Sequence, residues 1–128
     1  AIELATRPEA DGTAGLIVES TFTSVLDMSA LKYYGLLRCL PVRLLLNQRF
    51  NSIDKIHRVE RPILLIHGKN DSKIPYQMSL KLFEKAKKWS TLCLIEGADH
   101  ADCCLIGKVE YQQQIADFVS KCQRHLGK

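Results

Sequence analysis

The sequence of 128 residues predicts an α/β fold, a parallel β-sheet with helices on both faces. Three short apolar runs have the length and the β-branched content of buried strands, at residues 15–20, 63–66 and 91–96. Segments with helical periodicity precede, separate and follow these runs. Strands that alternate with helices are typical of a parallel sheet, because each helix returns the chain to the same end of the sheet. The length fits one domain.

The region up to the second strand is expected to be mostly helical, apart from the first strand. Residues 1–7 have helical character, and a proline follows closely enough to end that helix. After the first strand, Ser24 is placed to cap a helix over residues 25–34. A second helical segment at 41–46 and an irregular stretch or short helix at 50–56 complete this region.

The second strand, residues 63–66, is continuously apolar, which favours a strand covered on both faces. Pro75 is placed to start the following helix. In this helix Met78, Leu82 and Phe83 form an apolar stripe, while the lysines are expected to face solvent. The helix would therefore cover one face of the sheet between the second and third strands.

The third strand, residues 91–96, is expected to end at Gly97, and a long amphipathic helix is expected over residues 108–126. The apolar side of this helix comprises Ile115, Phe118, Val119 and Cys122. Such a helix would pack against the sheet and close the domain.

The composition excludes several classes of protein. The net charge of +4 is mild and lacks the dense basic stripe of a nucleic-acid-binding surface, so no nucleic acid partner is expected. The longest apolar stretch, residues 36–46, contains two arginines and a proline and is shorter than the roughly 20 residues of a membrane helix. The N-terminal residues do not have the pattern of a signal peptide.

The cysteines point to a reducing compartment. Their number is odd and their spacing irregular, which argues against a disulfide framework and favours a cytoplasmic protein. The adjacent pair Cys103 and Cys104 lacks the spacing of a zinc site. The five cysteines are Cys39, Cys93, Cys103, Cys104 and Cys122.

Two titratable residues follow two strands that are expected to be neighbours. Asp71 comes just after the second strand and His100 just after the third. A strand, helix and strand form a right-handed crossover whose parallel strands end at the same edge of the sheet. Ligands in open α/β sheets bind outside these carboxyl ends. We therefore expect Asp71 and His100 to face one crevice.

A carboxylate beside an imidazole has a defined chemical use. The carboxylate accepts the Nδ1 hydrogen, which fixes the tautomer, and the other ring nitrogen can then move a proton between a nucleophile and a leaving group. The residues alone leave a second interpretation open, in which Asp71 caps the following helix and His100 is an exposed loop residue.

Four segments of the chain resemble a known superfamily. HGKND (67–71) followed by IP, and GADH (97–100) before a closing amphipathic helix, resemble the C-terminal half of the α/β-hydrolase fold. The likeness is to serine hydrolases of the prolyl-oligopeptidase-like and dienelactone-hydrolase-like branch. GLIVESTFTS (15–24) is similar to the strand and loop after the nucleophile helix, and AIELA (1–5) to the helix behind the G-x-S-x-G nucleophile elbow.

The resemblance implies Asp71 as triad acid and His100 as general base, in the chain order of that fold. It implies hydrolysis of an ester, thioester or amide in a small-molecule or acyl substrate through an acyl-enzyme, without a cofactor. No G-x-S-x-G occurs in the 128 residues, and the oxyanion-hole segment is absent as well. We expect the serine to lie shortly before residue 1 of a longer protein and this chain alone to be inactive. The alternative is a non-catalytic interaction module that keeps the half-fold.

Other residues are weaker candidates for the same site. Glu19 ends the first strand and is an alternative acid. His67 is either a structural residue at a strand end or an oxyanion-type group. Asp99 and Asp102 could bind a metal together with His67, although their spacing is irregular, and no metal is expected.

Substitute nucleophiles are also present in the sequence. Ser20, Ser24 and Ser29 do not lie between small residues on a strand-to-helix turn, as a nucleophile elbow requires. Cys103 and Cys104 follow the histidine, against the chain order of the family.

Residues 25–47 occupy the place of a helical cap-like insertion over the pocket. Ser20 and Phe22 are candidates to line the substrate site, and plain core packing is the alternative for such side chains. Further candidates for the lining are Tyr33, Tyr34 and Leu37. The apolar residues 44–46, with Arg38 and Arg43, are a candidate contact with a membrane surface.

The first strand, residues 15–20, should pair with the nucleophile strand of the missing N-terminal half. An unpaired apolar edge favours aggregation. We therefore expect the 128-residue chain alone to be poorly soluble or partly molten.

Overall fold

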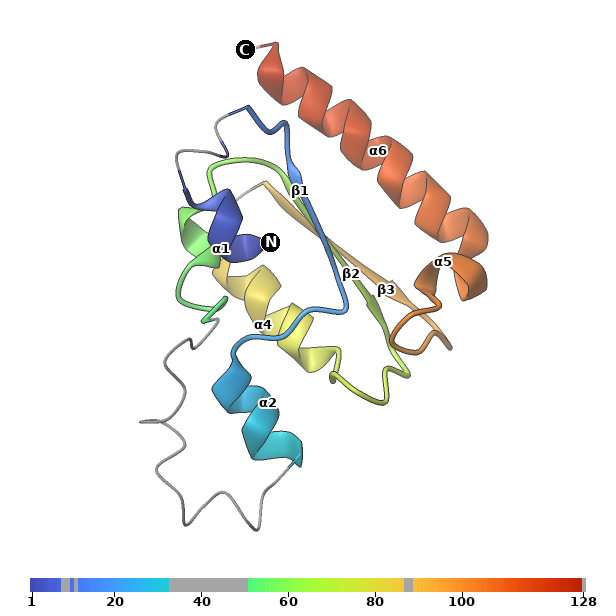
Figure 1. The fold of residues 1–128 in the computed structure, drawn as a ribbon. Coiled ribbons are helices and arrows are strands. Elements are labelled where there is room, and N and C mark those ends of the chain that lie inside the picture. The colour runs from blue at the N-terminus through green and yellow to red at the C-terminus, as the bar shows by residue number, and fades with distance from the viewer. Residues whose placement is uncertain (8–9, 11, 33–50, 87–88, 128) are drawn as a thin grey trace.

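The computed structural model describes residues 1–7, 10, 12–32, 51–86 and 89–127. Helices and strands alternate along the chain as the sequence predicts (Figure 1). In order, the elements are α1 (Ile2–Ala5), β1 (Leu16–Glu19), α2 (Val25–Lys32), the 3-10 helix η3 (Ile56–Arg58), β2 (Ile63–Gly68), α4 (Gln77–Lys85), β3 (Ser90–Ile95), α5 (Cys103–Ile106) and α6 (Lys108–Leu126).

The three strands form a parallel sheet in the order β1-β2-β3, which confirms the predicted fold class. Leu16 is aligned with Ile63, and Ile63 with Ser90. All six residues of the central strand β2 are buried. Its continuous apolar sequence thus reflects cover on both faces, since side chains of a strand point alternately to the two sides.

The two faces of the sheet carry separate hydrophobic clusters. Leu64 and Ile66 of β2 point to the face covered by α5 and α6, where Phe118 and Cys122 pack against them. Ile63 and Leu65 point to the opposite face, which α1, η3 and α4 cover (Figure 1). Complete burial of a side chain of this size stabilises a fold by about 1.5–3 kcal/mol. The strand β2 therefore joins both halves of the core.

Helix α2 begins where the sequence predicts a cap. The Asp27 amide donates a hydrogen bond to Ser24 Oγ at 3.0 Å, which satisfies one free N–H of the first turn. Of the predicted cap-like insertion over residues 25–47, the described part is this helix, beyond the carboxyl end of β1. The predicted segment 41–46, the aromatic residues at 33 and 34, Leu37 and the candidate membrane contact lie outside the described residues.

Two side chains differ from the predicted helix faces. Phe83 is 37% exposed, and Val119 is 47% exposed. Each follows directly after a residue that faces the sheet, Leu82 or Phe118, and a helix rotates by about 100° per residue. Their assignment to the buried faces was wrong. On α4 the buried face instead includes Ser79, which is fully buried.

Helix α5 was not predicted, since its four residues are too few to show a helical period. In the described ranges, no helix has the length and apolar character needed to cross a membrane.

Candidate active site

Two loops meet at the carboxyl edge of the sheet, one after β2 and one after β3. The Lys69 amide donates to the Ile95 carbonyl oxygen, and the Asn70 amide donates to the Ala98 carbonyl oxygen, both at 2.9 Å. A Cβ atom on Gly68 would lie 2.3 Å from the Ala98 oxygen, so a side chain does not fit there. Gly68 therefore permits the close approach that brings the two loops together.

The side chains of Asp71 and His100 meet between these loops. His100 Nδ1 lies 3.0 Å from Asp71 Oδ2. The Asp71 side chain is fully buried, whereas the His100 side chain is 29% exposed. No hydrogen bond joins Nε2 of His100 to any other described residue. The imidazole is thus oriented by the bond of its Nδ1 to a buried carboxylate, while its Nε2 remains available for proton transfer.

The other carboxylate oxygen of Asp71 serves the local turn. Oδ1 accepts the amide hydrogens of Lys73 at 2.9 Å and Ile74 at 2.8 Å. Helix α4 begins only at Gln77, with Tyr76 as its N-cap. Asp71 therefore does both things that the sequence left open: one oxygen stabilises the turn before the helix, and the other bonds to the histidine.

The environment of Asp71 favours its charged form. Burial acts to raise its pKa, but the hydrogen bonds from the Ile74 amide, His100 and the Lys73 amide outweigh burial. The net effect is a pKa below the usual value of an aspartate. At neutral pH the group is a carboxylate, as required to accept the Nδ1 hydrogen.

His67 makes a contact that the sequence did not predict. It is fully buried, and its Nε2 lies 3.1 Å from Asp71 Oδ2 and 2.8 Å from the Ile74 carbonyl oxygen. Its Nδ1 lies 2.6 Å from Ser79 Oγ. His67 is thus a structural residue at a strand end, as one interpretation held, and it also touches the candidate acid.

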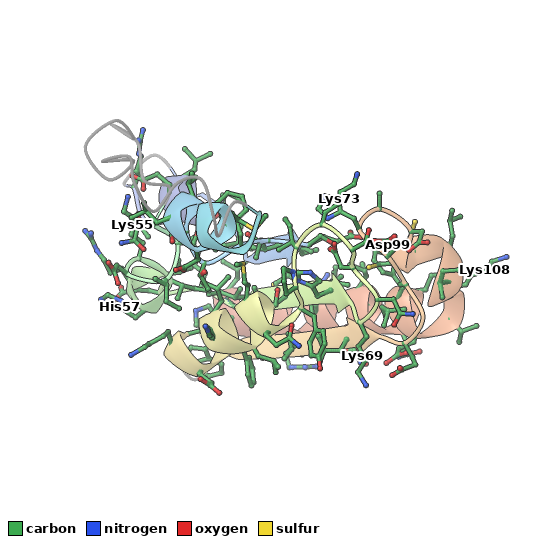
Figure 2. All side chains as sticks on the ribbon, turned by 90° about the horizontal axis from the view of Figure 1, so that it is seen from below. Lys55, His57, Lys69, Lys73, Asp99 and Lys108 are labelled. Carbon is green, nitrogen blue, oxygen red and sulfur yellow. The ribbon has the colours of Figure 1, made fainter. Side chains whose placement is uncertain are left out.

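Asp99 joins the two loops from the other side. Its Oδ1 accepts the Ser72 amide at 2.8 Å and the His100 amide at 2.7 Å, and these bonds lower its pKa. Asp102 Oδ1 in turn accepts the Asp99 amide at 2.6 Å. Figure 2 shows the labelled Asp99 and Lys73 at the same end of the molecule. The residues weighed as metal ligands thus have separate partners, and the described residues contain no group of three side chains suited to a metal.

Glu19, the alternative acid, has a different partner. The hydroxyl group of Tyr111 donates to Glu19 Oε2 at 3.0 Å, and this bond ties α6 to the end of β1. Burial and this glutamate raise the pKa of Tyr111 to about 12. The carboxylate that bonds to His100 is that of Asp71.

The substitute nucleophiles are unsuited to that role or lie outside the described side chains. Cys103 is fully buried, and burial first, with nearby Glu19, raises its pKa to about 12, whereas a cysteine nucleophile needs a thiolate. Ser24 caps α2, while Cys104 is an exposed free thiol. The side chain of Ser29 is not among those described.

Ser20 and Phe22, the candidates for the substrate lining, follow β1. Ser20 has a φ of 44°, and its buried hydroxyl has no hydrogen-bond partner among the described residues. Phe22 lines a hollow of about 160 Å³ together with residues of α1, β1 and the segment before η3. Neither Asp71 nor His100 lines this hollow. A role of Ser20 and Phe22 in substrate binding stays a prediction.

Comparison with known proteins places the chain in a family. Residues 43–125 match the prolyl oligopeptidase family of peptidases, which is most of the chain. Human alpha/beta hydrolase domain-containing protein 17B is 38% identical over 72 residues, which are 56% of this chain and 24% of that protein. The uncharacterised protein YfhR of Escherichia coli is 34% identical over 116 residues, 88% of this chain and 38% of that protein. The chain thus spans well under half the length of these relatives.

Solved structures agree on the fold. An esterase from Pyrococcus furiosus superposes with a TM-score of 0.68 at 16% identity, over 94% of this chain and 48% of that one. A monoacylglycerol lipase from Paleococcus ferrophilus superposes with a TM-score of 0.59 at 16% identity, over 95% of this chain and 63% of the lipase. The resemblance seen in the sequence is therefore confirmed. The chain belongs to the prolyl oligopeptidase family, within the α/β-hydrolase superfamily.

Proposed function

We propose that this chain supplies the acid and base of a serine hydrolase, with Asp71 as acid and His100 as base. The observation that carries the proposal is the 3.0 Å bond from Nδ1 of a part-exposed histidine to a buried carboxylate. The nucleophile would be a serine upstream of residue 1 in the complete protein, as the chain order of the fold requires. No cofactor is needed for this chemistry.

In this mechanism Nε2 of His100 removes the proton from the serine hydroxyl as its oxygen attacks the substrate carbonyl carbon. The same proton then passes to the leaving group, and the acyl-enzyme forms. Water, deprotonated by Nε2, releases the acid and restores the serine. Asp71, which is ionised and buried, keeps Nδ1 protonated and stabilises the imidazolium that forms in each step.

The titles of similar solved proteins support a substrate class for the complete protein. The similar solved proteins are titled an esterase, a monoacylglycerol lipase and an acylaminoacyl peptidase. These names share an acyl group bound through an ester or amide. We infer an ester, thioester or amide of a small-molecule or acyl substrate for the complete protein.

The partner of this chain would be the N-terminal half of the fold. In the described part of the sheet, β1 is an outer strand that bonds to β2 on one side, and Ile17 on it is 42% exposed. A nucleophile strand would pair along the other side of β1 and bring its serine to the edge that carries His100. Without it, the chain would be inactive.

The test uses the complete protein and a set of p-nitrophenyl esters. We expect His100→Ala to reduce kcat/KM by several orders of magnitude, because the base is lost. A serine-directed fluorophosphonate probe should label the complete protein and leave the 128-residue chain unlabelled. Activity of His100→Ala within tenfold of the wild type would overturn the assignment. A complete protein without ester hydrolysis or labelling would favour a non-catalytic interaction module.

A further inference from the structure

Two histidines lie against the acid of the candidate active site. Oδ2 of Asp71 lies 3.0 Å from Nδ1 of His100 and 3.1 Å from Nε2 of His67. The mechanism above uses the first contact and assigns nothing to the second. His67 is fully buried, so it contacts neither solvent nor substrate directly.

The protonation pattern of His67 follows from its neighbours. Nε2 faces the Ile74 carbonyl oxygen at 2.8 Å and the Asp71 carboxylate, both of which can only accept hydrogen bonds. Nε2 must therefore carry a hydrogen. In the neutral ring Nδ1 is then an acceptor, and Ser79 Oγ at 2.6 Å donates to it. The chain of donors runs from Ser79 to His67 to the Ile74 carbonyl oxygen, and Asp71 Oδ2 lies 3.1 Å from the same Nε2.

The contacts of Asp71 restrict the orientation of its carboxylate. Oδ1 of Asp71 accepts two backbone amides, from Lys73 and Ile74. Oδ2 bonds to Nδ1 of His100 and lies 3.1 Å from Nε2–H of His67, so rotation of the group would break contacts of both oxygens. Oδ2 is thereby held where the Nδ1 hydrogen of His100 needs it.

We propose that His67, held in its Nε2–H form by the Ile74 carbonyl oxygen and Asp71, is a positioning residue that keeps Asp71 against His100. Ser79 lies on α4 and is fully buried, and its contact with Nδ1 seats the ring beside the acid. The inference rests on the proposed function for its kinetic consequences. Its structural content, the tautomers of two histidines, can be measured without any activity.

Two amide substitutions separate the two contacts of His67. The Gln side-chain nitrogen is as many bonds from Cα as Nε2 of histidine, whereas the Asn nitrogen corresponds to Nδ1. His67→Gln can therefore keep an N–H near Asp71 Oδ2, and His67→Asn loses it while keeping a polar group near Ser79. In the complete protein we expect His67→Asn to lower kcat about tenfold, the lower end of the range for a hydrogen bond to a charged group, with KM nearly unchanged. His67→Gln should stay within about threefold of the wild type.

The second measurement is nitrogen-15 NMR of the imidazole rings in the complete protein at pH 8, where ordinary histidines are neutral. We expect the Nε2–H form for His67 and the Nδ1–H form for His100. Ser79→Ala should leave His67 in the Nε2–H form, because the acceptors that face Nε2 remain, whereas His67→Asn should give a mixture of tautomers at His100. Leu82→Ala is the control, because it removes a buried side chain of the same helix outside this chain of donors.

The outcomes separate this inference from the proposed function. If His100→Ala abolishes hydrolysis but His67→Asn matches His67→Gln in kcat and keeps His100 in the Nδ1–H form, the inference is overturned and the proposed function stands. If the complete protein hydrolyses nothing while the tautomers change as expected, the inference holds and the proposed function fails. Should His67→Asn not fold, the spectrum of the wild type still tests the inference, because an Nδ1–H form of His67 would leave no N–H toward Asp71 and would overturn it.

Discussion

Two edges of the same small sheet differ in whether their polar and apolar groups have partners among the described residues. At the carboxyl edge, the loops after β2 and β3 bond to each other through Asp71, His100 and Asp99, and the buried Asp71 carboxylate accepts three hydrogen bonds. Along the lateral edge, β1 presents Ile17 partly to solvent and has no second strand among the described residues.

The proposed acid and base lie within one unit, which runs from β2 through α4 and β3 to the loop after β3. The apolar lateral edge needs a further strand to be covered.

The largest effect is expected at the acid. Asp71→Asn keeps the shape of the side chain but removes the charge and one accepting oxygen, so His100 can take the wrong tautomer. In the complete protein kcat should fall by about 10⁴-fold, the size seen for this change in a serine protease triad. Steady-state ester hydrolysis measures it, with far-UV circular dichroism as a check on folding. A loss of less than tenfold would show that another group orients His100.

The approach of the two loops can be broken at Gly68. In Gly68→Ala the new Cβ would collide with the backbone oxygen of Ala98, so we expect a loss of about 3 kcal/mol of unfolding free energy. Gly12→Ala is the matched control, because a Cβ there meets nothing within 4 Å. Urea denaturation of the complete protein compares the two variants, and equal free energies of unfolding would contradict the close contact between Gly68 and Ala98.

The charged state of the carboxyl edge predicts a pH dependence. The pKa values of Asp71 and Asp99 are lowered in the folded protein, so their contribution to stability is full above the unfolded pKa of about 3.9 and is lost as pH falls through the folded values. We expect the urea midpoint of the complete protein to fall as pH is lowered from 5 to 3. Asp99→Asn should reduce this slope, and an unchanged slope would refute the contribution of Asp99.

The lateral edge should give the smallest effect. The 128-residue chain is expected to aggregate through β1, and a charged side chain on an edge strand opposes pairing between chains. Ile17→Lys should therefore reduce light scattering of this chain a few-fold at equal concentration. Val109→Lys is a control, since Val109 is 80% exposed on α6, away from the edge. A monomeric wild-type chain with a sharp cooperative melt would contradict the expectation.

The sequence predicted those parts of the fold that depend on periodicity and chain order. The helix over 108–126 has the predicted bounds, and the strands agree to within two residues at each end. The contact of Asp71 with His100 followed from the rule that neighbouring parallel strands end at one edge. These features need no knowledge of side-chain conformation.

The contacts of Ser79 and Asp99 could not be predicted in the same way. Ser72 and Asp99 are 27 residues apart and meet through the conformations of two loops. In the sequence, Ser79 only interrupts the apolar face of α4. Its contact with the ring of His67 becomes visible only in the folded structure. The spacing of His67 and Asp71 across a strand end was the one available signal, and the sequence alone gives it a structural meaning as readily as a functional one.

The parallel register also has a consequence for the order of folding. Pairing of Ile63 with Ser90 closes 27 residues of chain, whereas pairing of Leu16 with Ile63 closes 47. The entropy of loop closure therefore favours β2–β3 over β1–β2 by about 0.5 kcal/mol before any side chain packs. Amide hydrogens of β2 and β3 should exchange with solvent more slowly than those of β1. The unit that holds Asp71 and His100 would then be the first to form and the last to open.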